Sequence, residues 1–349
     1  MRRQCDRSGR VALLAALLGA ACHGPRPGLG PLPVRNQHPA QLTVQHLDPV
    51  AASTLPGGTV QARVTLAYTS LFLAGNGPGA EFAMDGEVLR SRLMARAGLG
   101  AGFELAAELP VLHTSGGFLD SFLIDYHELF GFPDQDRSDT PKDRFDVFAA
   151  QSGNRVFQLD EEPLLLADVP LSLTWGLVPP GRTGSNAGTP GLALRLGVEL
   201  PTGDEDHGAG NGEVDWAAGL AASWPLDLGT VHAAVQHTWA GTPDRARQNG
   251  FEFRDVTSAS GTFELPLLED LSGLVQFEWE TSTLRDLRIP VAADDQLLLW
   301  VGGRLRIDRD LYFELSFGED LASYVSPDFT AWFSVAWLPG PPSWRGRRL

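Results

Sequence analysis

Apolar and polar residues alternate with a two-residue period over most of the chain after residue 58. In the clearest segment the apolar positions are Val60, Ala62, Val64, Leu66 and Tyr68, and polar side chains stand between most of them. Successive side chains of a β-strand point to opposite faces, so this segment has one apolar and one polar face. No helical period of 3.6 residues competes with the alternation.

Twelve segments show this pattern, and most are long enough to cross a bilayer as tilted strands. They predict an all-β fold: a closed antiparallel transmembrane β-barrel of about 12 strands, occupying residues 58–338. The expected strands lie near 58–72, 82–97, 100–112, 164–178, 190–201, 213–224, 230–239, 251–265, 273–281, 296–307, 310–318 and 328–338. The strand at 251–265 is the least regular, because Asp255 falls on its apolar parity.

The lengths of the connections predict the topology. Short connections near 98–102, 225–229, 266–272 and 308–310 are expected as periplasmic turns, and longer polar ones near 73–81, 202–212, 240–250, 282–295 and 318–327 as outer loops. Periplasmic turns and outer loops alternate along the chain only if 113–163 is one long outer loop. We expect that loop to contain a short amphipathic helix over 121–130 and a hairpin over Phe145–Leu159. Pairing that hairpin, or residues 42–47, into the wall gives fourteen strands instead.

Charged residues occupy the parity opposite to the apolar one. A turn centred near residue 100 would place Arg96 opposite Glu104 and Arg92 opposite Glu108, and a turn at Arg309 would place Arg304 opposite Glu314. Such pairs on a wet wall contribute at most about 1 kcal/mol each, so we interpret them as fixing register and keeping the lumen wet. The residues predicted to line the lumen are Arg90, Arg92, Arg96, Glu104, Glu108, Arg195, Glu199, Glu278, Glu280, Arg304 and Glu314.

Tryptophans lie near strand ends, as expected for aromatic girdles at the two membrane interfaces. Trp216 and Trp224 share the apolar parity at opposite ends of one strand. Trp175, Trp239 and Trp337 also fall close to strand ends.

The N-terminus has the pattern of an export signal. A basic region with four arginines precedes the apolar stretch Val11–Ala21, which is too short to span a membrane. Cys22 follows small residues, so residues 1–21 are removed either by lipoprotein processing, which would acylate Cys22, or by ordinary signal peptidase. Residues 22–57 are then a linker or a plug inside the barrel, since the proline-rich part Gly30–Pro39 does not suit a strand. Residues 339–349 form a C-terminal tail.

Composition narrows the function classes. No stretch beyond the N-terminus is apolar over eighteen residues, which excludes a helical membrane protein. Removing residues 1–21 changes the net charge from −16 to −19 because they carry four Arg and one Asp, and such acidity argues against nucleic acid as a partner. The only other cysteine, Cys5, lies in the signal, so no internal disulfide or thiol-based metal site is expected. We predict no cofactor and no metal site.

The long loop 113–163 carries the only candidate chemistry. Asp120, Asp125 and His127 are close in sequence, and a carboxylate with an imidazole could act as a general base or as half of a metal site. No nucleophilic serine motif accompanies them. The alternative, which we favour, is that they cap and hydrogen-bond a loop folded at the barrel mouth.

Several motifs resemble, in order, those of an uncharacterised family of Gram-negative exported proteins grouped with outer-membrane β-barrels. They are Gly30–Pro39, Asp120–Pro133 (DSFLIDYHELFGFP), Leu200–Asp204 (LPTGD), Glu319-Asp320 and Pro327–Phe329. The resemblance implies the barrel fold and carries no activity. One departure is the tail after Trp337, because barrels of this kind often end on an aromatic residue.

These features together predict a monomeric barrel in the outer membrane of a Gram-negative cell, in contact with outer-membrane lipid and with the barrel assembly machinery. We interpret it as a passive or gated pathway for a small solute, with 113–163 restricting the mouth. The alternatives are an enzyme acting on lipid or envelope substrate through Asp120, Asp125 and His127, a purely structural envelope protein, and a soluble periplasmic β-sandwich.

Overall fold

The computed structural model describes residues 29–121, 141–181, 188–321, 325–327 and 329–339. The predicted signal, Cys22 and nearly all of the predicted tail and loop helix lie outside these residues. In the described part no helix is long and apolar enough to cross a membrane.

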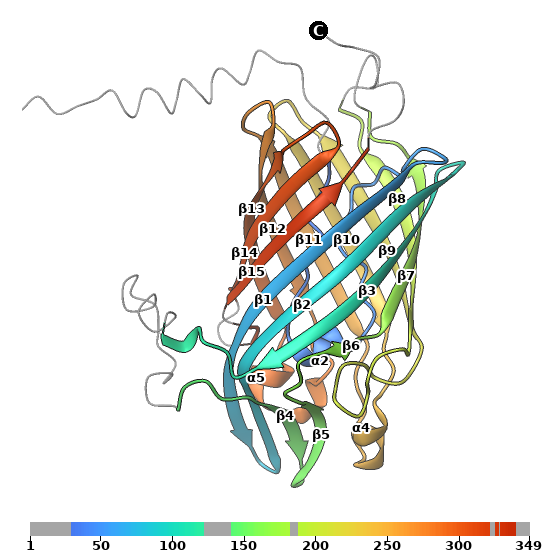
Figure 1. The fold of residues 1–349 in the computed structure, drawn as a ribbon. Helices are drawn as coiled ribbons and strands as arrows, with labels where there is room; N and C mark the ends of the chain where they lie inside the picture. Colours follow the sequence, from blue (N-terminus) through green and yellow to red (C-terminus); the bar gives the residue numbers. More distant parts are fainter. Residues whose placement is uncertain (1–28, 122–140, 182–187, 322–324, 328, 340–349) are drawn as a thin grey trace, which may run out of the picture.

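Twelve antiparallel strands form a closed barrel (Figure 1). Each strand pairs with the next along the ring, and the last, β15, pairs with β1 from Ala62↔Trp337 to Ser70↔Phe329, which closes the wall. The predicted fold class and the count of twelve are therefore confirmed. The barrel strands are β1 (Val60–Gly77), β2 (Ala80–Gly100), β3 (Phe103–Ser115), β7 (Val169–Val178), β8 (Gly191–Leu200), β9 (Asp215–Pro225), β10 (Thr230–Trp239), β11 (Val256–Pro266), β12 (Leu271–Glu280), β13 (Gln296–Arg306), β14 (Leu311–Asp320) and β15 (Phe329–Trp337).

Three shorter strands lie outside the closed ring. The expected hairpin over 145–159 is present as β4 (Asp146–Gln151) and β5 (Asn154–Leu159), and β4 pairs with the first residues of β2. The two-residue strand β6 (Leu165–Leu166) pairs with β3. Neither the hairpin nor residues 42–47 enter the wall, so the fourteen-strand alternative is wrong.

The two ends of the barrel differ (Figure 1). We call the end with the tight connections after β2, β9, β11 and β13 the turn end. The opposite, loop end carries β4, β5 and the short helices α2 (Pro39–Leu42), α4 (Asp244–Gln248), η4 (Arg285–Leu287) and α5 (Pro290–Ala293). One expected loop, 73–81, is instead strand: β1 and β2 continue past the neighbouring wall and are joined by Pro78 and Gly79 alone.

The predicted register of the first turn is wrong by two residues. Arg96 pairs with Ala106 and Glu104 with Gly98, because the chain reverses at Ala101 and Gly102 rather than at residue 100. Both turn residues have positive φ, 51° and 81°, which matches the two-residue turn that suits the twist of a hairpin. The opposite charges still meet on the diagonal, where Arg96 Nη2 lies 2.6 Å from Glu104 Oε1. At the other turn Arg304 does pair with Glu314, as predicted.

The outer surface of the wall is apolar. Val64, Leu93 and Leu196 are about half exposed, whereas their sequence neighbours Arg63, Arg92 and Arg195 are buried. Trp216 and Trp224 are both exposed, at opposite ends of β9. Asp255 lies just before β11 begins at Val256, which removes the one irregular position of that predicted strand. The wall therefore presents an apolar belt outward and a charged face inward.

Candidate functional site: a plugged lumen

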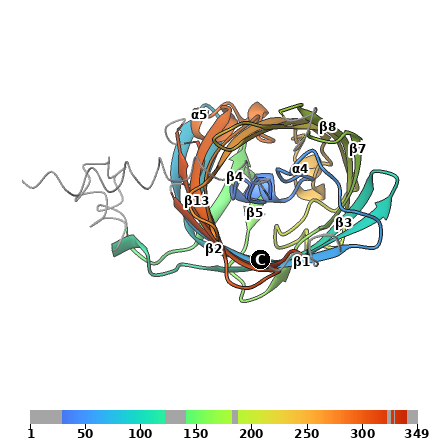
Figure 2. The same cartoon turned by 90° about the horizontal axis from the view of Figure 1, so that it is seen from above.

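The N-terminal segment fills the lumen. We call residues 29–52 the plug; nearly all of them from Gly30 to Ala52 are buried although few belong to regular structure. The view along the barrel shows this segment inside the ring of strands (Figure 2). Irregular backbone is tolerated at membrane depth where it is enclosed by protein. Of the two alternatives for this part of the chain, the structure has the plug.

The plug crosses the lumen twice. Its outgoing limb starts at the turn end, where Gly30 N donates to the carboxylate of Glu264 over 3.0 Å, and reaches the loop end, where Gln41 Nε2 donates to Thr281 O over 2.9 Å. The returning limb ends at the turn end, where Ala52 N donates to Ser223 Oγ over 2.8 Å. Helix α2 makes the reversal, and its Pro39 suits the first turn of a helix.

Two glutamines of the wall each hold one plug residue by its backbone. Gln276 on β12 accepts from Leu32 N over 2.6 Å and donates to Leu32 O over 3.2 Å. Gln236 on β10 makes the same pair with Leu47, over 2.6 and 3.2 Å. Buried backbone groups need partners, and these carboxamides replace the partner strand that the plug lacks. We call Gln236 and Gln276 the glutamine clasps; one holds each limb.

Charged side chains of the wall also bind the plug. Arg92 Nη1 lies 2.5 Å from Asp48 Oδ2, and the same guanidinium contacts Pro33 O on the other limb. Arg195 Nη1 donates to Asp48 O over 2.6 Å. Arg304 Nη1 donates to Gly30 O over 3.1 Å. Arginines predicted to face water thus bridge the wall to the plug.

A second charged group ties the wall together near the turn end. Glu314 on β14 is fully buried and accepts from Arg63 Nε over 2.9 Å, Arg304 Nε over 2.7 Å and Ser334 Oγ over 2.7 Å. Arg304 also lies 3.0 Å from Glu264 Oε1. Removing one member of such a buried group leaves the others desolvated and unpaired, which is costly.

Part of the inner wall is apolar. Leu32 and Val34 of the plug form a cluster with Ala67, Leu274, Leu298, Trp300 and Trp332 of the wall, all buried. These wall positions have the parity of the lumen, which is otherwise charged. They form a dry contact that only a bound segment would bury.

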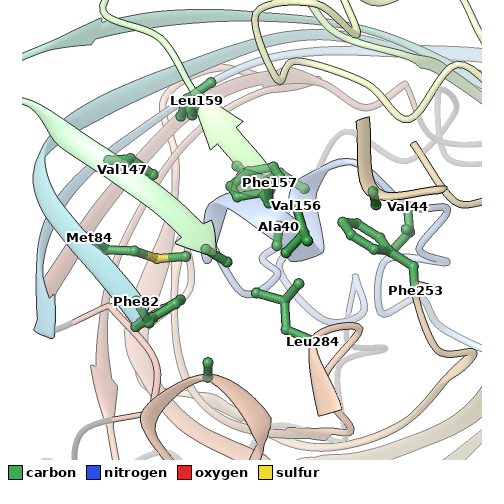
Figure 3. Packing of buried hydrophobic residues seen from close by; sticks show 14 of the residues in the cluster. Ala40, Val44, Phe82, Met84, Val147, Val156, Phe157, Leu159, Phe253 and Leu284 are labelled. Carbon is green, nitrogen blue, oxygen red and sulfur yellow. The ribbon is translucent and has the colours of Figure 1, made fainter. Parts of the chain in front are cut away.

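The loop end is closed by a larger apolar cluster. Side chains of the hairpin, such as Val156 and Phe157, meet Ala40 and Val44 of the plug and Phe253 of the loop before β11 (Figure 3). The cluster also includes Leu71 and Leu73 from the long end of β1, Phe82 and Met84 from that of β2, and Leu284. We call it the cap. The cap and the plug share residues, so one packed unit closes this end.

Space remains toward the turn end. A cavity of about 70 Å³ lies between the plug and the wall, lined by Asp48, Arg96, Glu104, Glu108 and Arg195 among others. Arg96 and Glu108 are the most exposed members of the predicted lumen set, with 22% and 15% of their side chains exposed. A small vestibule, lined by charged and by apolar side chains, therefore lies beside the plug at this end.

The structure brings all the predicted lumen residues to the inner face of the wall. Apart from Arg96 and Glu108 they are buried, including Arg90, Glu199, Glu278 and Glu280. The expectation of a wet wall is wrong, because the plug covers these side chains.

Of the candidate catalytic residues, Asp125 and His127 lie outside the described residues. Asp120 is described, and its carboxylate accepts from Asp143 N over 2.9 Å. That contact is a hydrogen bond within the loop, and the roles of the three residues stay predictions.

The family model described as "Protein of unknown function (DUF3187)" matches residues 12–337, which include the plug and every barrel strand. The chain belongs to this family. No curated protein matches the DUF3187 chain.

Among solved structures, the chain is similar to the COG4313 outer membrane channel from Pseudomonas putida F1, with 13% identity, a TM-score of 0.51, and coverage of 84% of this chain and 100% of that one. The similarity supports the barrel fold. Weaker similarities are to the KdgM porin (9% identity, TM-score 0.42, coverage 79% and 98%) and to the P. putida toluene transporter TodX (11% identity, TM-score 0.39, coverage 83% and 94%).

The motifs quoted for the DUF3187 family have structural roles here. Gly30–Pro39 is the outgoing limb of the plug and the start of α2. Leu200–Asp204 begins the loop after β8, where Gly203 N donates to Asp168 Oδ1 over 2.7 Å, and Asp168 Oδ2 accepts from Asn211 N over 3.1 Å. Burial raises the pKa of the Asp168 carboxyl. The motif thus shapes a loop at the loop end.

Sequence reasoning missed the inner tryptophans and the clasps. A signal for the first exists: Leu297, Leu298, Leu299 and Trp300 are apolar on both parities, and a strand that is apolar on both faces is buried on both. No local signal distinguishes Gln236 or Gln276 from other lumen residues, because their partners lie far away in the sequence.

Proposed function

We propose that this protein is an outer-membrane channel for small polar solutes or ions, held closed by the plug and the cap. The observation that carries the proposal is the plug itself: the inner face of the barrel is lined with charged side chains, and the chain's own N-terminal segment occupies it through non-covalent contacts. A barrel with a purely structural role would not need a charged inner face covered by a separate segment of the chain.

The contacts favour a plug that can leave. It is held by hydrogen bonds, ion pairs and apolar contacts of side chains rather than by continuous strand pairing, so no sheet has to be broken when it leaves. The vestibule at the turn end already admits solvent to Arg96 and Glu108. The apolar belt and the tryptophans at both ends of β9 support a location in the outer membrane, with the turn end toward the periplasm.

Planar-bilayer recording of the full mature chain and of a variant lacking residues 29–52 tests this function. We expect rare, brief openings from the full chain and sustained conductance from the deletion variant. Heat-modifiable gel migration and circular dichroism establish that the variant still forms a barrel. A folded deletion variant without conductance would contradict the proposal.

A further inference from the structure

Two buried carboxylates on β12 lie near the charge of Arg35 but are not paired with it. Glu278 and Glu280 share the inner face and are 2% and 1% exposed. In the described part of the chain neither lies in an ion pair with an arginine or a lysine; the side chain that faces both is the imidazole of His46, on the returning limb of the plug. Two adjacent buried carboxylates repel each other and require compensation.

Glu278 is the more exceptional of the two. Both of its carboxylate oxygens are fully buried and have no well-aligned donor among the described residues; the nearest groups are His46 Nε2, 3.2 Å from Oε1, and the Trp300 side chain. Glu280 accepts from Asn36 Nδ2 over 2.7 Å and from Gln41 Nε2 over 2.9 Å. A buried carboxylate with such poor hydrogen bonding is costly, so a cation bound between Glu278 and His46 would lower that cost.

The geometry around His46 fits a metal ion. Its Nε2 lies 3.2 Å from Glu278 Oε1 and its Nδ1 lies 3.9 Å from Glu280 Oε2, and one ligand atom from each residue can be chosen so that all lie within 4.8 Å of one another. Zn²⁺ binds nitrogen and oxygen at about 2.0–2.2 Å, which places two tetrahedral ligands roughly 3.4 Å apart. Small movements of side chains would bring the set to that spacing.

We propose that His46, Glu278 and Glu280 form a binding site for a divalent transition-metal ion of the Zn²⁺ type. One imidazole and two carboxylates suit such an ion better than Mg²⁺ or Ca²⁺, which prefer oxygen alone. The charges balance, because two carboxylates neutralise the ion. Three arginines act on His46 through their charge. Arg35 donates to Gln41 O over 2.5 Å and Arg195 to Asp48 O over 2.6 Å, whereas Arg90 Nη1 has no hydrogen-bond partner among the described residues.

The site joins the plug to the wall, because His46 belongs to the plug and both glutamates belong to β12 of the wall. It therefore exists only when the plug is in place, which is why the sequence alone predicted no metal site. The bound ion adds a removable link to the returning limb. Its effect on gating rests on the proposed channel function, whereas binding of the ion does not.

The test measures metal in the full mature protein, purified in detergent through a tag without histidines. Elemental analysis after exposure to ZnCl₂ and gel filtration should give one Zn²⁺ per chain, removable by EDTA, and calorimetric titration of the stripped protein should give one site. H46N and E278Q should each weaken binding at least tenfold. H232N is the matched control, because His232 is also buried in the lumen and faces one carboxylate, Glu264; it should bind as the wild type does.

Circular dichroism and heat-modifiable migration establish that each variant is folded, and E278Q keeps the size of the side chain if H46N disturbs the plug. Absence of stoichiometric Zn²⁺ in the wild type, or unchanged affinity in folded E278Q, would overturn the proposal and leave a His–Glu ion pair only. If the protein conducts but binds no Zn²⁺, the metal site is refuted and the channel function is not. If it binds Zn²⁺ but does not conduct, the channel function is refuted and the metal site is not.

Discussion

Replacing a glutamine clasp by leucine should open the channel more often. In Gln236→Leu the side chain keeps its approximate size but can neither accept from Leu47 N nor donate to Leu47 O, which now lie 2.6 and 3.2 Å from the carboxamide. Both backbone groups then stay buried without a partner whenever the plug is in place. In the open state water satisfies them, so the substitution acts on the closed state only.

The magnitude follows from the two lost partners. Each unsatisfied buried group costs about 1–3 kcal/mol, so even the lower limit for two groups destabilises the closed state by about 2 kcal/mol. Since 1.4 kcal/mol is roughly a factor of ten, the ratio of open to closed should rise about 30-fold. Gln276→Leu acts on the other limb through Leu32 and should have a similar effect. In the double variant the two effects should add, if the limbs respond independently.

Single-channel recording at fixed voltage gives the open probability directly. Thr262→Val is the matched control: Thr262 lies on the same inner face and is buried, and among the described residues it makes no hydrogen bond to the plug. The control should behave as the wild type does. Unchanged open probability in the folded double variant would refute the view that the clasps hold the plug.

Three further substitutions test other parts of the structure. Glu314→Gln should lower the free energy of unfolding by about 3 kcal/mol, because two buried arginines lose their shared carboxylate; urea titration of the barrel in detergent micelles measures it, and a shift below 0.5 kcal/mol would contradict it. Ala101→Asn should raise the same quantity by up to about 1 kcal/mol, since asparagine tolerates positive φ better; a lower midpoint would refute the assigned turn. Gly197→Leu should raise the open probability, because a Cβ there would lie 2.8 Å from Leu47 Cδ2 and push the plug away. Gly261→Leu is the control, since its Cβ would meet open space. Equal open probabilities of the two variants in bilayer recordings would contradict this prediction.

The wall could be predicted from the sequence because its pattern is local. Alternating side chains fix which face of each strand is apolar, and the even count and the long excursion follow from keeping the turns in phase. The pattern predicts wrongly where backbone conformation decides. It centres the first turn at residue 100, whereas the chain reverses at Ala101 and Gly102, and it predicts a loop over 73–81, where β1 and β2 continue.

The interior could be predicted only in part, because it depends on contacts between distant segments. The alternation predicts that charged residues such as Arg92 and Glu280 lie on the inner face, and they do. It does not predict whether water or protein covers that face, because both leave the same alternation. The proline-rich segment 30–39 left two alternatives open. The metal-ligand set of His46 with Glu278 and Glu280 appears only after the plug has folded back through the barrel.

A reducible lock on the plug tests most directly whether its departure opens the channel. In Leu47→Cys/Gly197→Cys the two side chains would meet, since a Cβ at 197 would lie 2.8 Å from Leu47 Cδ2 and against Gln45 Nε2. A disulfide requires Cβ atoms about 3.5–4.5 Å apart, so mass spectrometry first establishes that the bond forms. The pair is placed in the Gln236→Leu background, so that openings are frequent, and each single cysteine serves as a control. Openings should vanish on oxidation and return with dithiothreitol. Equal open probability before and after a disulfide verified by mass spectrometry would show that solute passes without movement of the plug.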